Sequence, residues 1–416
     1  MMRRWTAVLP ALVLACSSGN SPGEGGETPD AGDLTDGAVT RPSEGDADIF
    51  EDMLAGEVAP ADGLRQIAWS GGWPLERGGK FVFVHLDDGG GPYRLAGDHN
   101  GWSPTTMNAA DGFYWTEVVV PGPASSHYKF VNASDEYSAD RWARRYGYDE
   151  FGEISRVRAD DAHLERWPEL RADGLATRDL RVWVPDGEIS HHLYVHDGQN
   201  LFDPGAMHGG WQLTSTAPAG TLVVGIDNTA DRMNEYTHVV DDIGEGDIGG
   251  SGDAYADLVE LSIRPRIEAE YGTPTRVGVM GSSLGGLISL HIADRYPGSY
   301  DFVASLSGTL GWGSFANKSE TLIERYQSAG KRDFVIYVDS GGNDGGGCFD
   351  GDADGINDDS GYTDNYCTNR QMADVLAGLG YTYDTDLYHW HELDAPHNEV
   401  AWAARVFRPL GIFAAL

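Results

Sequence analysis

The sequence is short of basic residues, of cysteine and of long apolar runs. Lysine and arginine number 29 against 65 aspartates and glutamates, so the formal net charge is 29 − 65 = −36 over 416 residues. A chain this acidic repels the phosphates of nucleic acids and of anionic lipids, and we expect neither as a partner. Only three cysteines are present. The apolar run at residues 7–15 is too short to span a bilayer as a stable anchor.

The first residues have the pattern of an export signal. Arg3 and Arg4 precede the short apolar run, which ends in Leu-Ala-Cys at residues 14–16. This ending resembles the lipobox of bacterial lipoproteins. The resemblance implies that residues 1–16 form a lipoprotein signal peptide cleaved before Cys16, that Cys16 is lipidated, and that Ser17 directs the protein to an outer membrane. We expect an exported protein, periplasmic or at the cell surface, that touches the membrane only through its lipid anchor. An ordinary secretory signal is the alternative.

The expected export also bears on the other two cysteines, and a different composition begins directly after the signal. With Cys16 lipidated, Cys348 and Cys367 form an even pair in an oxidising compartment, which predicts a disulfide between them. Residues 17–60 are rich in glycine, proline, serine, threonine and acidic residues, and most of this segment lacks large apolar side chains. Such a composition cannot bury a core, so we expect a disordered linker there.

Residues 61–160 have the pattern of a small β-sandwich. Four short apolar strands are separated by glycine- and proline-rich turns, at residues 80–85, 93–96, 114–120 and 127–131. The stretches L-A-G-D-H-N-G-W-S-P at 95–104, D-G-F-Y-W at 111–115 and Y-K-F at 128–130 resemble the glycogen-binding module that precedes isoamylases. The resemblance implies an immunoglobulin-like sandwich in which Trp102, Lys129 and Tyr137 contact a glycan, with the aromatic rings stacked on sugar. The alternative is that Trp102 and Tyr128 belong to the core and the domain only positions its neighbour.

From residue 175 to residue 416, strand patterns alternate with helix patterns, after a linker at 166–175. Alternation of this kind predicts an α/β fold with a mostly parallel sheet covered by helices on both faces. Within it, residues 281–285 read Gly-Ser-Ser-Leu-Gly between an apolar strand and a helix. Small residues suit the strained turn that exposes the nucleophile of an α/β-hydrolase, so Ser283 is the candidate nucleophile. A glycine-rich turn with an idle serine is the alternative.

Three further stretches supply the other parts of such a site. Gly198 frees the loop after an early strand, and we expect the backbone N–H groups of Gln199 and Leu284 to form the oxyanion hole. His397 lies before the last helix, where a general base belongs. The acid that orients His397 should follow a later strand; Asp344 is the predicted acid and Asp339 the alternative.

Four motifs in this region resemble one family. They are H-D-G-Q-N-L-F-D at 196–203, R-M-N-E-Y at 232–236, G-S-S-L-G-G at 281–286 and P-H-N-E-x-x-W at 396–402. They resemble the putative esterase family, which includes enterochelin, feruloyl and acetylxylan esterases. The resemblance implies a serine ester hydrolase that needs no cofactor for catalysis and acts on a small-molecule or polysaccharide ester, either carbohydrate-linked or a siderophore. The competing hypothesis is a surface glycan-binding lipoprotein with an inert hydrolase domain.

The segment between Cys348 and Cys367 has a calcium-loop pattern. Aspartates alternate with small residues before a glycine, as in the calcium loops of EF-hands and thrombospondin type 3 repeats. The twelfth position is Gly361 where an EF-hand has glutamate. The resemblance implies a structural Ca²⁺, and the alternative is an acidic, solvated loop. The predicted ligands are Asp350, Asp352, Asp354, the carbonyl of Ile356, and Asp358.

Overall fold

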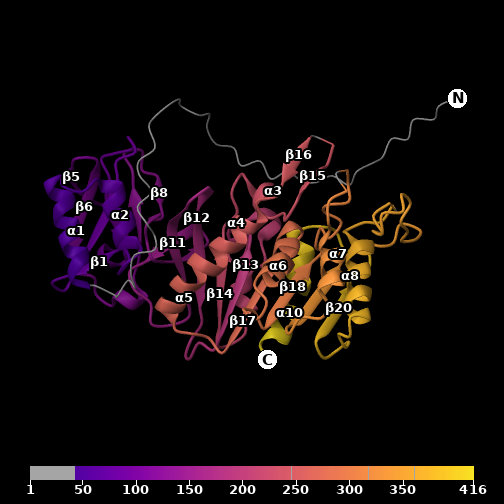
Figure 1. Cartoon of the computed structure of the whole chain (residues 1–416). Coiled ribbons are helices and arrows are strands. Elements are labelled where there is room, and N and C mark those ends of the chain that lie inside the picture. The colour runs from indigo at the N-terminus through magenta and orange to yellow at the C-terminus, as the bar shows by residue number, and fades with distance from the viewer. Residues whose placement is uncertain (1–42, 245, 317, 360) are drawn as a thin grey trace. The chain divides into compact units, whose positions relative to one another are not determined.

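The computed structural model describes residues 43–416 except 245, 317 and 360 (Figure 1). The expected signal peptide, Cys16 and residues 17–42 of the expected linker lie outside the described residues. Within the described part of the chain, no helix combines the length and the apolar character needed to cross a bilayer.

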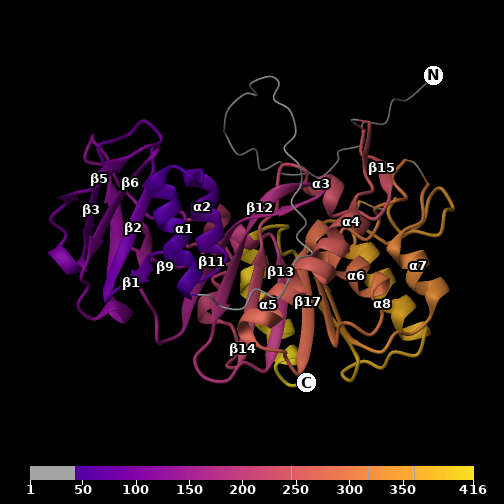
Figure 2. The same ribbon diagram turned by 60° about the vertical axis from the view of Figure 1, so that its left-hand side comes forward.

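Residues 43–60, which we expected in the disordered linker, fold into α1 (Ser43–Ala55) and the start of α2 (Pro60–Ala68). The two helices lie beside the first β-sheet (Figure 2). Phe50 of α1 and Leu64 and Ile67 of α2 are fully buried, in one cluster with Val82 and Val84 of that sheet. The linker prediction was therefore wrong over this stretch. Its apolar residues are few, but their helical spacing gathers them on one buried face.

Two sheets follow, the second of which is antiparallel in this region. The first has the order β1 (Leu75–Arg77), β2 (Lys80–Leu86), β6 (Phe113–Val118) and β5 (Asn108–Ala110). Phe81 and Phe83 of β2 share a buried cluster with Leu95, Tyr128 and Phe130, so the two sheets pack face to face. The strands of the second sheet in this region are β9 (Arg145–Asp149), β10 (Gly152–Arg156), β7 (His127–Val131), β3 (Arg94–Gly97) and β4 (Thr105–Thr106), with β8 (Tyr137–Ser138) paired to β7.

The second sheet does not end at the boundary expected between the two domains. It continues from β9 into β11 (His163–Ala172) and β12 (Leu175–Val184), which form a hairpin across the predicted linker at 166–175. The hairpin turns through Asp173 and Gly174, and Gly174 has a φ of +74°. An Asp-Gly pair between two β-strands is a strong hairpin signal, and it explains why this segment is not a linker.

The remaining strands form the parallel part of the same 14-stranded sheet. Every adjacent pair among them is parallel, whereas β12 is antiparallel to β14. The sheet is therefore mixed, and the prediction of a mostly parallel sheet was wrong for the sheet as a whole. The parallel strands are, in spatial order, β20 (Leu387–His391), β19 (Val335–Ser340), β18 (Phe302–Leu306), β17 (Arg276–Ser282), β13 (His191–His196) and β14 (Thr221–Ile226).

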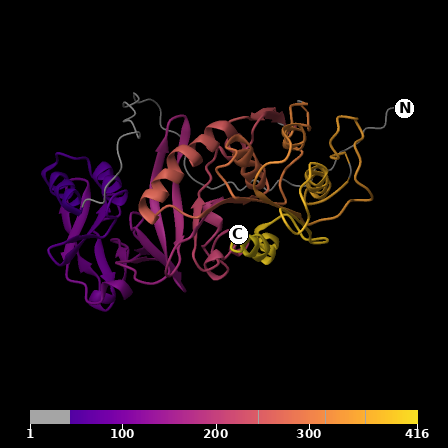
Figure 3. The same cartoon turned by 60° about the horizontal axis from the view of Figure 1, so that its bottom comes forward.

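Helices and loops cover the two faces of the parallel strands (Figure 3). One buried cluster contains Tyr255, Ile267 and Leu287. It joins the sheet to α4 (Gly252–Asp257), α5 (Arg264–Tyr271), α6 (Leu284–Arg295), α7 (Leu322–Ala329) and α8 (Tyr366–Gly378), with a π-helical segment, Leu258–Ile263, between α4 and α5. A second cluster, which includes Trp402 and Phe413, packs α9 (Glu399–Arg405) and α10 (Phe407–Phe413) on the sheet. The short α3 (Arg232–Glu235) precedes the hairpin of β15 (Val240–Asp242) and β16 (Asp247–Gly249).

Candidate active site

Ser283 stands at the tip of the turn between β17 and α6. Its φ of +57° and ψ of −124° lie in a region that non-glycine residues rarely adopt, and such strain is characteristic of functional sites. The backbone is too crowded there for larger residues: a Cβ at Gly281 would lie 2.6 Å from the backbone of Gly285, and one at Gly286 would lie 2.5 Å from Ser305 Oγ. The small residues of the motif are therefore needed for the turn to form.

His397 faces this serine from the loop before α9. Its Nε2 lies 2.9 Å from Ser283 Oγ, within reach for proton transfer. The ring packs edge-on against Trp402 with a centroid separation of 5.0 Å. The Asn398 side chain accepts a hydrogen bond from the Ala401 N–H and caps α9. Packing and the cap together fix the position of the histidine.

The carboxylate that contacts His397 belongs to Asp364. Its Oδ1 lies 2.5 Å from His397 Nδ1, and the side chain is almost fully buried. Its Oδ2 accepts a hydrogen bond from Ser307 Oγ at 2.7 Å and another from the Gly341 N–H. Ser283, His397 and Asp364 thus form one continuous hydrogen-bonded chain.

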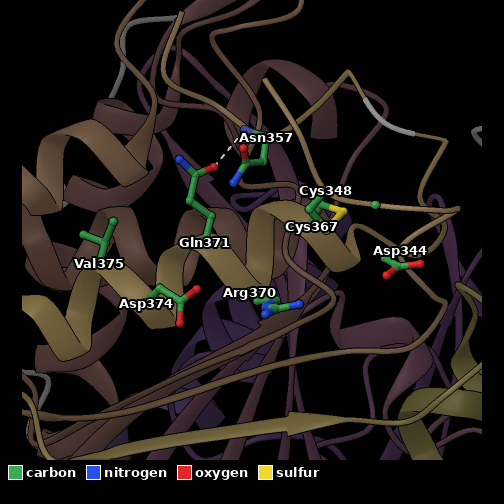
Figure 4. Close-up of a pocket in the computed structure, with 9 residues that line it drawn as sticks. Asp344, Cys348, Asn357, Cys367, Arg370, Gln371, Asp374 and Val375 are labelled. Carbon is green, nitrogen blue, oxygen red and sulfur yellow. Dashed lines mark hydrogen bonds between the residues drawn. A yellow bond between two sulfur atoms is a disulfide. The ribbon is translucent and has the colours of Figure 1, made fainter. Parts of the chain in front are cut away.

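Asp344, the residue expected to orient His397, does not reach it, and this prediction is corrected. Asp344 is exposed, accepts a hydrogen bond from Gly346 N–H at 3.1 Å, and lines a surface pocket beside the Cys348–Cys367 disulfide (Figure 4). The physical reason is the path of the inserted loop. Its two ends run side by side, with Thr363 N–H donating to Asn343 O at 3.1 Å, and the returning end brings Asp364 to the histidine.

Asp339, the alternative acid, is fully buried and faces Arg405 instead of His397. Arg405 Nε and Nη2 lie 2.9 and 3.1 Å from its two carboxylate oxygens. Burial raises the pKa of Asp339 from its ordinary value, and Arg405 opposes that shift. The same guanidinium donates to Ser307 Oγ at 2.6 Å and lies 3.7 Å from Asp364 Oδ2. Asp339 therefore holds the Arg405 guanidinium in place beside Asp364, and does not itself contact His397.

The two expected oxyanion donors lie after neighbouring parallel strands. Leu284 is the first residue of α6, so its N–H has no acceptor within the helix. Gln199 lies in the single 3₁₀ turn Gly198–Asn200 that follows β13, and β13 pairs directly with β17. Parallel neighbours end at the same edge of the sheet, which brings this turn and the nucleophile turn together. The oxyanion hole itself stays a prediction.

Asp197 anchors the Gln199 turn. Arg232 Nε and Nη2 lie 2.7 and 2.8 Å from its carboxylate, and Asn228 Nδ2 donates to it at 2.5 Å. Burial opposes ionisation, but Arg232 and Asn228 hold the pKa of Asp197 below its ordinary value. The Asn228 N–H donates in turn to Gln199 Oε1 at 3.1 Å. The Asp197 carboxylate thus holds Asn228, and Asn228 holds Gln199, so these contacts fix the turn that we expect to bind the oxyanion.

The predicted glycan residues share no interaction in the structure. The indole N–H of Trp102 donates to Asp98 Oδ1 at 2.9 Å. Lys129 is only 6% exposed, and its ammonium group donates to the Phe151 carbonyl at 3.3 Å. Tyr137 is exposed on β8. The lysine is therefore occupied within the fold, and glycan contact at these residues stays a prediction.

The inserted loop brings together a different set of carboxylates from the one predicted. Oxygens of Asp350, Asp352 and Asp359 lie within 4.8 Å of one another. Asp358 is turned away, because it accepts a hydrogen bond from the Ser314 hydroxyl, and burial raises its pKa. The other predicted ligands also have partners: Asp352 and Asp354 both contact the Lys318 ammonium group, and Ile356 is buried. Sequence reasoning missed Asp359, which the alternating pattern does not include.

A strained nucleophile turn, a histidine and a buried aspartate at the carboxyl edge of parallel strands define a site of the α/β-hydrolase type. Residues 178–411, more than half of the chain, match the model of the family described as Putative esterase. The chain belongs to this family, which confirms the resemblance seen in its motifs.

Individual relatives are distant. Over 138 residues the chain is 29% identical to the uncharacterised protein YbbA of Bacillus subtilis (strain 168), a match that covers 31% of this chain and 53% of that protein. The chain thus spans about half the length of the curated relative it matches.

Similar solved structures include three esterases or hydrolases. The enterobactin esterase FES of Shigella flexneri is 14% identical, with a TM-score of 0.43, and the match covers 81% of this chain and 93% of that chain. An IroE-like serine hydrolase of Shewanella oneidensis is 22% identical, with a TM-score of 0.45, and the match covers 61% of this chain and 80% of that chain. The siderophore hydrolase EstA of Aspergillus nidulans is 17% identical, with a TM-score of 0.44, and the match covers 60% of this chain and 94% of that chain. At TM-scores this low, these likenesses carry no conclusion about this chain, and its membership rests on the family match.

Substitution of each candidate acid by asparagine tests which carboxylate orients His397. Asp364→Asn should lower kcat on a chromogenic ester by about ten-thousandfold, because the histidine loses the acceptor that fixes its tautomer and stabilises its charged form. Asp344→Asn is the matched control and should leave kcat unchanged. Steady-state kinetics of the two variants decides the matter, and loss of activity in Asp344→Asn alone would reverse the assignment.

Removal of Arg405 tests the support beneath Asp364. Arg405→Met should lower kcat with little change in KM, because Arg405 is buried beside Asp364 and out of reach of the substrate. It should also lower the free energy of unfolding by about 3–5 kcal/mol, because the buried Asp339 loses its charged partner. Arg405→Lys keeps the charge and should recover part of kcat. Arg408→Met, which removes a cation stacked on Trp390, is the control. Wild-type kcat in Arg405→Met would contradict a positioning role.

Proposed function

We propose that this protein is a serine ester hydrolase in which Ser283, His397 and Asp364 are the catalytic residues. The observation that carries the proposal is the continuous chain from Ser283 Oγ through both ring nitrogens of His397 to Asp364 Oδ1. In this constellation the histidine takes the serine proton and later gives it to the leaving group.

The reaction proceeds in two halves. Ser283 Oγ attacks the ester carbonyl carbon as its proton passes to His397 Nε2, and the N–H groups of Leu284 and Gln199 stabilise the oxyanion. Asp364 holds the other ring nitrogen and stabilises the imidazolium. The alcohol leaves with the proton from His397, and the acyl group stays on Ser283. Water, deprotonated by the same histidine, then releases the acid.

We propose carbohydrate-linked acetyl or feruloyl esters and siderophore esters as the substrate candidates, from the motifs shared with the family. The packed sheets of residues 75–156 are proposed as an immunoglobulin-like, glycogen-binding-module-like domain, in which exposed Tyr137 and part-exposed Trp102 offer aromatic surface to a glycan. The pattern around Cys16 supports export as a lipid-anchored protein, and the scarcity of basic residues argues against nucleic acid as a partner.

An ester panel separates the enzyme from a glycan-binding lipoprotein with an inert hydrolase domain. Wild-type protein should hydrolyse at least one of a short-chain acetyl ester, a feruloyl ester and a siderophore trilactone. Ser283→Ala should abolish that hydrolysis with an unchanged melting temperature, since the side chain removed is small and partly exposed. A wild type inactive on all three esters would favour the binding protein.

A structural Ca²⁺ in the inserted loop also stays a proposal, now with Asp350, Asp352 and Asp359 as the carboxylate ligands. Clustered carboxylates repel one another, so a cation that binds only the folded loop raises stability. We expect the melting temperature to be higher in millimolar calcium than in chelator. Asp359→Asn should abolish the difference, and Asp358→Asn, whose carboxylate faces Ser314, should preserve it. Equal melting curves for the wild type would show that the loop binds no calcium and would overturn the proposal.

A further inference from the structure

A groove of about 500 Å³ lies apart from the catalytic residues. Its walls come from β9, β10, β11 and β12 and from the loop that follows the Gly198–Asn200 turn. None of the proposed catalytic or oxyanion residues lines it. The lining residues that matter here are Tyr146, Tyr148, Arg156, Trp183, Phe202 and Gln212. Its volume is within the range of small-molecule sites.

Aromatic side chains form much of this surface. Trp183 and Tyr148 are partly exposed, and both pack from one side against the buried cluster that contains Phe202. Each ring therefore has a rigid backing and a part that solvent reaches. Rings held in this way offer an apolar face next to polar groups, which suits a ligand with both kinds of surface.

Three polar atoms of the groove residues have no partner. The hydroxyls of Tyr146 and Tyr148 and the Nε of Arg156 are buried, and within the described residues nothing accepts from them or donates to them. Tyr146 is itself only 1% exposed. Buried polar groups normally find a hydrogen-bond partner, so three unpartnered groups among the residues of one groove favour a polar occupant. A sugar hydroxyl both donates and accepts, and it can satisfy a phenol and a guanidinium N–H alike.

The charged groups of the groove already have internal partners. Arg156 Nη2 donates to Asp161 Oδ1 at 2.8 Å. His163 Nε2 lies 3.2 Å from Glu165 Oε1, and His127 Nδ1 lies 3.2 Å from an oxygen of Asp98. Arg156, the permanently charged base among these three, is thus paired, and the net charge of the chain repels an anion. Asp149, which also lines the groove, accepts a hydrogen bond from the Phe151 N–H at 2.8 Å. These contacts disfavour an anionic occupant, and a neutral one would meet the unpartnered groups without bringing a further charge.

We propose that this groove binds a neutral saccharide, with a sugar ring on the aromatic surface of Trp183 and Tyr148 and its hydroxyls bonded to the tyrosine hydroxyls and Arg156 Nε. The groove wall and the Gln199 turn belong to one hydrogen-bonded loop, since Trp211 N–H donates to Asn200 O at 2.8 Å and Leu213 N–H donates to Leu201 O at 2.9 Å. A polysaccharide held in the groove is thereby tethered to the loop that carries the expected oxyanion donor.

Affinity electrophoresis of the full-length Ser283→Ala protein tests the proposal without turnover of the ligand. Native gels contain arabinoxylan, mixed-linkage β-glucan, glycogen or, as the anionic comparison, polygalacturonate. At least one neutral polysaccharide should retard the protein. Tyr148→Phe, which removes only the unpartnered hydroxyl, should weaken retardation at least about threefold. Trp183→Ala should abolish it.

Matched controls come from exposed aromatic residues that lie neither in the groove nor among the residues proposed to contact glycan. Tyr383→Phe and Phe407→Ala should leave retardation unchanged. The proposal is overturned if no neutral polysaccharide retards the protein, if polygalacturonate alone does so, or if retardation is lost in Trp102→Ala and kept in Tyr148→Phe. Should Trp183→Ala melt at a lower temperature than its parent, Tyr148→Phe decides. Because Ser283→Ala cannot hydrolyse esters, binding here and activity in the ester panel succeed or fail separately.

Discussion

One buried cation, the guanidinium of Arg405, ties the elements of the site to one another. It extends from α9, two turns after His397, and reaches Asp339 at the end of β19, Ser307 after β18 and Asp364 before α8. A buried charge is tolerated only when it is paired, so these four segments must meet in one arrangement. The histidine and its carboxylate are consequently fixed to the same sheet edge, although 33 residues separate them in the sequence.

Local pattern was enough to find the parts of the site that depend on neighbours in sequence. Ser283 was identifiable because the turn needs Gly281, Gly285 and Gly286 for steric reasons, and those residues are adjacent. His397 was identifiable because it precedes a helix whose cap and apolar face follow directly. The same holds for most strands of the parallel sheet, whose apolar runs are unbroken. In each of these cases a short stretch of sequence contains all the residues that cause the local structure.

The errors arose where the cause lies far away in sequence. Asp364 follows a long insertion, and only the return of that loop shows which aspartate meets the histidine. Sequence did offer a clue, because Asp364 and Asn365 stand directly before a helix, but so do many aspartates. Residues 166–175, which contain most of β11 and the turn into β12, resemble a linker in sequence because their charged residues hide the alternation, although Asp173 and Gly174 mark the turn. The strand pairings that make the sheet mixed likewise join segments far apart in sequence, so no single segment predicts them.

The origin of Asp364 on the returning end of the insertion has a consequence for how this chain can change over generations. The backbones of residues 345 and 361 nearly touch, since a Cβ at Gly345 would lie 2.1 Å from Gly361 O. The aspartate is held by Gly341, Ser307 and the start of α8, all outside the excursion between those two glycines. Descendant sequences that vary the exposed part of this excursion therefore keep the hydrogen-bond partners of Asp364, as long as they also keep the buried Ile356 and the Cys348–Cys367 disulfide, which join the excursion to the rest of the fold.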